Sequence, residues 1–183
     1  MIDIKVTKEI IEHSEKQIDK HNFGQRFEFN GNKEQQLTGV IGQSAIMFNF
    51  SLGMVESNGF DDGFDLIYSG LKIDVKTMGR KTSVKPYFTN NFVALQDKFK
   101  PDIYIFCSYN ILIQQLTICG WISKQHFNEK RKFYSKGNKR FRSDGSFFIT
   151  KTDLYEIGMN DINDVIDFDD LKLQLKEYSM NKN

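Results

Sequence analysis

Apolar residues recur at helical spacing in four stretches of the chain. In the stretch 33–50, Leu37, Val40, Ile41 and Phe48 fall on one side of a helix, because residues three, four or seven positions apart share a helical face. The same argument applied along the chain predicts helices over 7–21, 33–50 and 88–99, and a short closing helix that carries Leu171, Leu175 and Tyr178.

The clearest helical spacing follows the first of the two prolines. Phe88, Phe92, Leu95 and Phe99 are separated by four, three and four residues, which is typical of an amphipathic helix. The second proline, Pro101, ends this predicted helix, because the residue before a proline is disfavoured in the helical conformation.

The predicted helix 33–50 contains two glycines, Gly39 and Gly42. A glycine inside a helix costs about 1 kcal/mol relative to alanine. With Ser44 and Ala45, these glycines form a surface of small side chains. We therefore expect this helix to pass close to another backbone.

Short runs of β-branched and aromatic residues predict the strands. Two apolar runs flank Ser69 and Gly70, and we interpret residues 64–80 as a hairpin. Further strands are predicted over 102–109, 116–122 and 147–150, and 23–32 is a strand or an extended loop. This order of elements predicts an α/β fold with a mixed central β-sheet flanked by helices. At about 150 residues per domain, the 183 residues form a single domain, 1–183.

The hairpin places charged residues on one face. With Ser69 and Gly70 as a two-residue turn, Leu66 pairs with Ile73, and Asp65 lies opposite Asp74. Strand alternation then puts an apolar set on the core face: Leu66, Tyr68, Leu71, Ile73 and Val75. It puts a mainly polar set on the other face: Asp65, Ile67, Lys72, Asp74 and Lys76.

Asp65 and Asp74 are candidate metal ligands. Directly opposed residues in such a pair have Cβ atoms about 4.5–5.5 Å apart, and two carboxylates at that distance repel each other unless a cation or a proton intervenes. Mg²⁺, which prefers oxygen ligands, is the simplest such cation. Lys76 projects from the same face, where its ammonium can hold a water molecule and offset negative charge on a phosphate.

This hairpin resembles the metal-binding motif of the PD-(D/E)xK, or restriction-endonuclease-like, nuclease superfamily. The motif residues are Asp65 and, after eight intervening residues, Asp74-Val75-Lys76. Such nucleases often carry a glutamate on the preceding helix in the pattern Gly-x-x-Gly-Glu-x-Ala. In this chain the corresponding residues run from Gly39 to Ala45, and Gln43 stands where the glutamate is expected.

The resemblance implies a restriction-endonuclease-like core over about 33–155, with a helical extension before it and an acidic segment after it. It also implies that Asp65, Asp74 and the Val75 carbonyl hold Mg²⁺, for which Mn²⁺ can substitute. Lys76 then orients or activates the attacking water, and Gln43 is a further site residue. The implied function is a Mg²⁺-dependent DNA endonuclease of a restriction, homing or phage type.

Charge is segregated along the chain although the total is balanced, with 25 basic and 24 acidic residues. Residues 124–142 contain eight basic residues and one acid, interleaved with aromatic residues, which suits phosphate contacts and base stacking. Residues 153–170 contain seven acids and no Lys or Arg, and we expect a solvated face there. The predicted DNA contacts are Arg80, Lys81, Lys85, Lys130, Arg131, Lys132, Lys139, Arg140 and Arg142.

Composition narrows the protein class further. Cys107 and Cys119 do not form a Cys-x-x-Cys pair, which excludes a zinc ribbon or finger and suggests a reducing compartment. No apolar run approaches the ~18 residues of a membrane span. We therefore expect a cytoplasmic protein with no membrane partner.

The sequence leaves alternatives for catalysis, for the substrate and for the oligomeric state. The same fold can serve as a non-catalytic nucleic-acid-binding module, and the substrate of a nuclease can be branched DNA or RNA. A homodimer is expected for a restriction or homing enzyme, because symmetric cutting of both strands needs two copies of the site.

Overall fold

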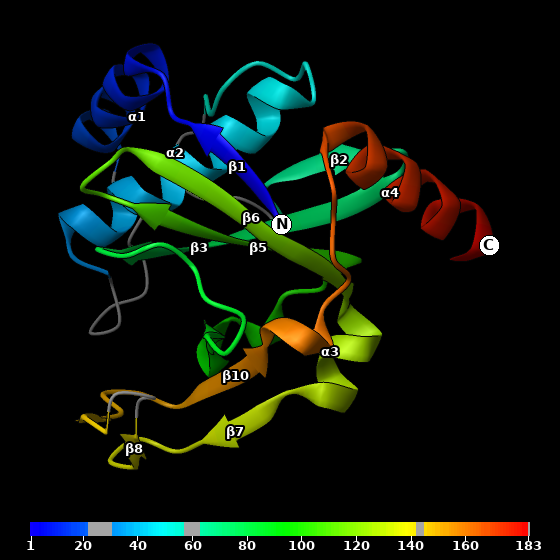
Figure 1. The fold of residues 1–183 in the computed structure, drawn as a ribbon. Helices are drawn as coiled ribbons and strands as arrows, with labels where there is room; N and C mark the ends of the chain where they lie inside the picture. The colour runs from blue at the N-terminus through cyan, green and yellow to red at the C-terminus, as the bar shows by residue number, and fades with distance from the viewer. Residues whose placement is uncertain (22–30, 57–62, 142–144, 183) are drawn as a thin grey trace.

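The computed structural model describes residues 1–21, 31–56, 63–141 and 145–182 (Figure 1). Its helices are α1 (Lys8–Lys20), α2 (Lys33–Asn49), α3 (Lys124–Lys130) and α4 (Phe168–Lys182), with 3-10 turns η2 (Ala94–Lys98) and η3 (Met159–Asp161). Its strands are β1 (Ile2–Lys5), β2 (Leu66–Tyr68), β3 (Leu71–Arg80), β4 (Thr89–Val93), β5 (Ile103–Asn110), β6 (Gln115–Ser123), β7 (Lys132–Tyr134), β8 (Lys139–Phe141), β9 (Phe147–Ile149) and β10 (Leu154–Gly158).

The central element is a five-stranded mixed sheet in the order β1-β6-β5-β3-β2. β3 and β5 run parallel, and the other neighbours are antiparallel. The fully buried strand β5 lies in the middle of this sheet. Figure 1 shows the sheet between α1, α2 and α4 on one side and the β4-β10-β7 sheet with α3 on the other.

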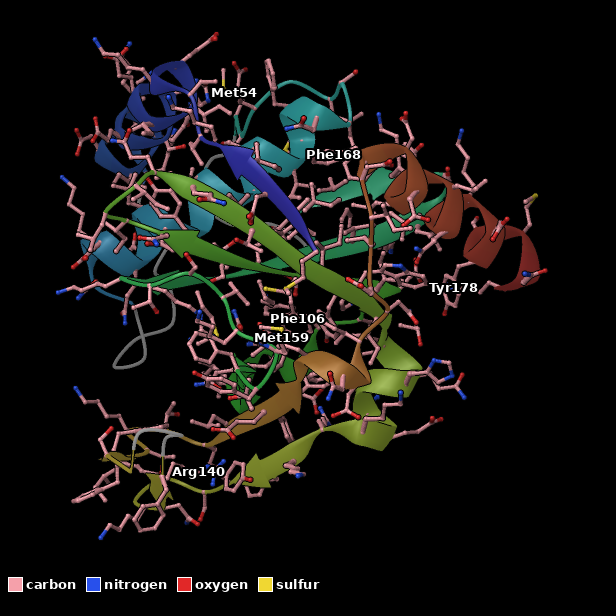
Figure 2. All side chains as sticks on the ribbon, viewed as in Figure 1. Met54, Phe106, Arg140, Met159, Phe168 and Tyr178 are labelled. Carbon is pink, nitrogen blue, oxygen red and sulfur yellow. The ribbon has the colours of Figure 1, made fainter. Side chains whose placement is uncertain are left out.

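Each face of the central sheet has its own apolar core. The core on the α1, α2 and α4 side includes Ile46 of α2, Ile105 of β5 and Leu171 of α4, all fully buried. The second core is aromatic and contains Phe92, Tyr104, Phe106 and Phe127. Figure 2 shows Phe106 and Met159 on the side of the second core, and Met54, Phe168 and Tyr178 on the helical side.

The α/β class with a mixed sheet flanked by helices is confirmed. α1 and α2 form within two residues of the predicted bounds, and side chains of Thr7 and Asn32 cap their first turns. The strands predicted over 102–109 and 116–122 are β5 and β6, and the closing helix is α4 with Leu171 and Leu175 fully buried. The possible strand at 23–32 lies almost wholly outside the described residues.

The hairpin has the predicted register. Leu66 pairs with Ile73, Ile67 with Lys72 and Tyr68 with Leu71. The turn residues Ser69 and Gly70 both have positive φ, at 49° and 77°, as a two-residue hairpin turn that follows strand twist requires. The predicted core face is confirmed, because Leu66, Leu71, Ile73 and Val75 are buried and Tyr68 packs against them.

The predicted helix over 88–99 is wrong. Residues 89–93 form the strand β4, and 94–98 form the 3-10 turn η2. β4 pairs with β10, and its two buried side chains are those of Asn90 and Phe92. Pairing with β10, which lies far away in the sequence, therefore overrides the helical spacing of the phenylalanines.

The expectation of a solvated face over 153–170 is also wrong in part. Leu154, Glu156 and Ile157 of β10 are buried, and β10 pairs on one side with β4 and on the other with β7. The acidic segment therefore begins as the central strand of a sheet. Its single buried acid, Glu156, forms an ion pair with Arg140.

α2 makes a close approach at one of its two glycines, to a side chain rather than to the predicted backbone. A Cβ atom added to Gly42 would lie 1.9 Å from Thr77 Oγ1 of β3, whereas one added to Gly39 would meet nothing within 4 Å. Gly42 therefore lets α2 pack directly on β3. Among the described residues, no helix has the length and apolar character that crossing a membrane requires.

Candidate active site

Asp65 lies just before β2 and binds the edge of β3. Its backbone N–H donates to Ile73 O at 2.8 Å, and its Oδ2 accepts the Val75 N–H at 2.6 Å. The carboxylate thus takes the place of a strand partner for Val75 beyond the end of β2. Asp65 is partly buried.

Asp74 and Lys76 lie on β3 and form an ion pair. Lys76 Nζ is 2.6 Å from Asp74 Oδ1, and the two side chains are 17% and 6% exposed. The Lys76 ammonium also lies 5.5 Å from the centre of the Phe92 ring. Burial and this aromatic contact hold the lysine beside the carboxylate.

Asp65 is not directly opposite Asp74 as predicted, but its carboxylate binds the backbone of Val75, the next residue along β3. The β2–β3 ladder ends at Leu66 and Ile73, so Asp65 is not a regular cross-strand partner of Asp74. Asp65 instead binds the Val75 backbone at the strand edge, and Asp74 is the residue next to Val75. A strand residue directs its N–H and C=O to the same edge, so the Val75 carbonyl points to the edge where Asp65 lies.

Gln43 of α2 is adjacent to this arrangement. Its Nε2 donates to the backbone carbonyl of Asp65 at 3.2 Å. The amide therefore supports the chain segment that carries Asp65, which a glutamate cannot do in the same way because an ionised carboxylate only accepts hydrogen bonds. This contact brings Gln43 into the site as a residue that positions Asp65.

These groups fit a divalent cation that prefers oxygen ligands. Two carboxylates and a backbone carbonyl are the donors that Mg²⁺ and Mn²⁺ accept. Within the part of the chain that the structure describes, no cluster of three or more His, Cys, Asp or Glu residues is found. A site at Val75 therefore has to be built from the two aspartates together with the carbonyl and water.

A second polar network borders the site and has no signal in the sequence. Tyr104 of β5 pairs with Asp74 across the parallel ladder and is fully buried. Its hydroxyl is 2.9 Å from Lys124 Nζ, which donates to Asp97 Oδ1 at 2.5 Å. Arg131 Nη1 lies 2.7 Å from the same carboxylate oxygen. Four residues from β5, η2, α3 and the following chain thus form a network that includes Tyr104, the cross-strand neighbour of Asp74.

This network shifts the pKa values of two of its groups, Tyr104 and Asp97. Burial, followed by the negative charges of Asp74 and Asp97, raises the pKa of Tyr104 above its usual value. The hydrogen bond from Arg131, with further contributions from Lys124, lowers the pKa of Asp97. Tyr104 is therefore a neutral hydroxyl and Asp97 an ionised carboxylate at neutral pH.

Three of the residues predicted to contact DNA are held within the protein. Arg80 Nη2 donates to Thr89 O at 2.9 Å, and its guanidinium lies 4.6 Å from the centre of the Phe88 ring. Arg131 pairs with Asp97, and Arg140 pairs with Glu156 at 2.5 Å. These arginines join segments of the fold, and their contact with DNA stays a prediction.

The remaining basic residues divide by exposure. The described lysines of the predicted interface are all exposed, namely Lys81, Lys85, Lys130, Lys132 and Lys139. Arg142 lies outside the described residues. Lys81 and Lys85 follow β3, whereas the other three belong to α3 and the strands after it.

The comparisons with known proteins do not identify a family. No protein-family model, curated protein or solved structure matches this chain.

Proposed function

We propose that the protein is a Mg²⁺-dependent DNA endonuclease with a restriction-endonuclease-like core. The observation that carries the proposal is that Asp65 binds the backbone N–H of Val75, the residue between Asp74 and Lys76, while Lys76 Nζ lies 2.6 Å from Asp74 Oδ1. A bound cation would favour the ionised form of both carboxylates.

Asp65, Asp74 and the Val75 carbonyl would hold the cation, Mg²⁺ or Mn²⁺. Such a cation supplies Lewis-acid stabilisation of the charge that develops on a phosphodiester. Lys76 carries a positive charge in a site that is only 17% exposed, where an ammonium is worth more than in water. It can donate to an anionic phosphate oxygen or hold a water molecule for in-line attack.

The first test is cleavage of supercoiled plasmid with Mg²⁺, with Mn²⁺ and with EDTA. We expect metal-dependent nicking that Lys76→Ala slows by about 100-fold or more. Lys72→Ala is the matched control, because Lys72 is an exposed lysine on the same strand. Equal cleavage by wild type and Lys76→Ala would disprove the assignment of Lys76.

Metal binding can be measured without catalysis. Isothermal titration with Mg²⁺ should show one binding event in the wild type that Asp74→Asn removes. The variant preserves side-chain shape and removes the charge that a cation needs. Unchanged binding in Asp74→Asn would place the cation elsewhere.

The alternative is a non-catalytic nucleic-acid-binding module on the same fold. It is favoured by the Asp74–Lys76 ion pair, which satisfies both charges without a cation, and by the amide of Gln43, which supports Asp65 structurally. A wild-type protein that is inert on duplex, single-stranded and branched DNA and on RNA, yet binds DNA with steep salt dependence, would establish this alternative.

We also propose that the endonuclease acts as a homodimer, because cutting both strands symmetrically needs two copies of one site. Sedimentation velocity with and without DNA tests this. A monomer under both conditions would contradict it.

A further inference from the structure

The hairpin formed by β8 and β9 carries an exposed face that nothing in the described structure covers. Phe141 pairs with Phe147 and Lys139 pairs with Ile149, and alternation along the strands puts all four side chains on one side. Phe141 is 64% exposed, Phe147 51% and Ile149 48%, and Lys139 is also exposed. We call these four residues the outer hairpin face.

The opposite side of the hairpin is anchored to the protein. Arg140 pairs with buried Glu156 of β10, and its guanidinium lies 3.7 Å from the centre of the Tyr134 ring. At the base of the hairpin, Thr150 Oγ1 donates to Ser135 O at 2.6 Å and accepts from the Asn138 N–H at 2.8 Å. The outer hairpin face therefore belongs to a hairpin that is anchored to the rest of the fold.

The hairpin also lies at an outlying position in the fold. Figure 1 shows β8 at the end of β7 and β10 that is remote from the central sheet, and Figure 2 shows Arg140 where the hairpin meets these strands. A surface at this position can contact a partner molecule that is bound to the central sheet region at the same time.

The chemistry of the outer hairpin face combines aromatic rings with positive charge. The Phe141 and Phe147 ring centres are 6.2 Å apart, and Lys139 Nζ lies 3.9 Å from the centre of the Phe147 ring. Residues 131–141 and 145–158 contain six basic side chains and two acidic ones. The excess of positive charge favours a polyanion as the ligand. The two aromatic rings favour a ligand that also has flat apolar surfaces.

A second copy of the chain fits this face less well. A stable protein interface buries about 800 Å² on each partner, whereas a few half-exposed side chains on two three-residue strands offer much less. Nucleic-acid bases, in contrast, bind one aromatic ring at a time.

We propose that the outer hairpin face binds unpaired bases of DNA, with Phe141 and Phe147 stacking on bases and Lys139 contacting an adjacent phosphate. The bases must be unpaired or unstacked, because the rings need access to a base face that an intact duplex covers. This inference rests on the proposed function only for the choice of DNA as the polymer.

The test is fluorescence anisotropy with a labelled single strand and its matched duplex, in EDTA so that no cleavage occurs. Replacing Phe141 or Phe147 by Ala should weaken single-strand binding by about 5- to 150-fold, which corresponds to the loss of one stacked base. Phe48→Ala is the matched control, since Phe48 is a 49% exposed phenylalanine on α2, across the central sheet from the hairpin. It should bind like the wild type.

Two further variants separate stacking from other effects. Phe141→Leu with Phe147→Leu retains apolar bulk and removes the rings, so it should lose affinity as the alanine variants do. Lys139→Ala should reduce the dependence of log affinity on log salt by about one contact. Circular dichroism and sedimentation should show that each variant keeps its fold and its oligomeric state.

Several outcomes would overturn the inference. They are unchanged single-strand binding in the phenylalanine variants, an equal loss on single strand and duplex, a change of oligomeric state, or no DNA binding by the wild type. The nuclease proposal fails separately, if the wild type cleaves no DNA. A loss of binding in the phenylalanine variants would still support the outer hairpin face.

Discussion

At the residue scale, Asp65 combines a structural contact with a candidate catalytic one. Its Oδ2 accepts the Val75 N–H just before β2 begins, so the carboxylate extends the pairing along the edge of β3. The same carboxylate is one of two that a cation can use. Substitutions at this position must therefore separate loss of folding from loss of metal.

Asp65→Asn and Asp65→Ala make that separation. Asn retains an oxygen that can accept the Val75 N–H, so we expect its free energy of unfolding to stay within about 1 kcal/mol of the wild type. Ala leaves that N–H without a partner and should cost about 1–3 kcal/mol. Both variants should lose Mg²⁺-dependent cleavage. Urea unfolding and plasmid nicking measure the two effects, and full cleavage by Asp65→Asn would remove Asp65 from the metal site.

Asp97 makes part of the stability depend on pH. The hydrogen bond from Arg131 lowers the pKa of Asp97 in the folded protein below that in the unfolded chain. A carboxylate of this kind stabilises the fold above its unfolded pKa, about 3.9, and loses that contribution as pH falls through its folded pKa.

Asp97→Asn should therefore be less stable than the wild type at pH 7, and the difference should narrow below about pH 4. Denaturant unfolding at several pH values measures this difference. A gap that stays constant with pH would show that the ionisation of Asp97 does not contribute.

At the element scale, packing decides what two glycines of one helix do. Gly42 lies against Thr77 of β3, whereas Gly39 has open space where a Cβ atom would be. In an isolated helix, the two glycines would lower helix stability by the same amount. Only the tertiary contact distinguishes them.

Gly39→Ala should stabilise the protein by up to about 1 kcal/mol, because it adds helix propensity without a clash. Gly42→Ala should destabilise it by about 1–3 kcal/mol or more, because its Cβ would lie 1.9 Å from Thr77 Oγ1. Adding Thr77→Ala should restore part of this loss. Thermal unfolding of the three variants tests the contact, and equal effects at the two glycines would contradict it.

Segment 88–99 shows why elements are misassigned from spacing. Of the four apolar residues at helical spacing, β4 contains only Phe92, because Phe88 precedes the strand and Leu95 and Phe99 follow it. The other buried position of β4 is Asn90. Because a polar residue occupies it, hydrophobic periodicity cannot reveal the two-residue repeat.

At the scale of the whole molecule, the fold brings the basic and acidic segments together. β7 of the basic segment pairs with β10 of the acidic one, and Glu156 neutralises Arg140. Lys81 and Lys132 remain exposed. The positive charge that we propose for DNA contact is therefore carried mainly by exposed lysines rather than by the partly buried arginines.

Lys81→Ala and Lys132→Ala should each lower the salt dependence of DNA binding by about one phosphate contact without changing the stability of the fold. Lys8→Ala is the control, because Lys8 is exposed on α1, on the helical side of the central sheet. Affinity measured against salt concentration checks this. A slope that Lys8→Ala changes equally would indicate nonspecific attraction.

The amino-acid sequence by itself determined the β2–β3 hairpin, its register and its buried face. These follow from a two-residue turn and strand alternation, which depend on neighbours in the chain. It also indicated Asp65, Asp74, Lys76 and Gln43, and the structure joins Gln43 to Asp65, Asp65 to the Val75 backbone, and Asp74 to Lys76. Metal binding and catalysis by this group stay predictions.

Only the tertiary structure decided how the other charged residues are used. Arg131 meets Asp97, and Arg140 meets Glu156, across segments that are distant in sequence. It likewise made 89–93 a strand, through pairing with β10. Local patterns report the preferences of neighbouring residues, whereas an ion pair or a sheet partner depends on which distant segments the fold places in contact.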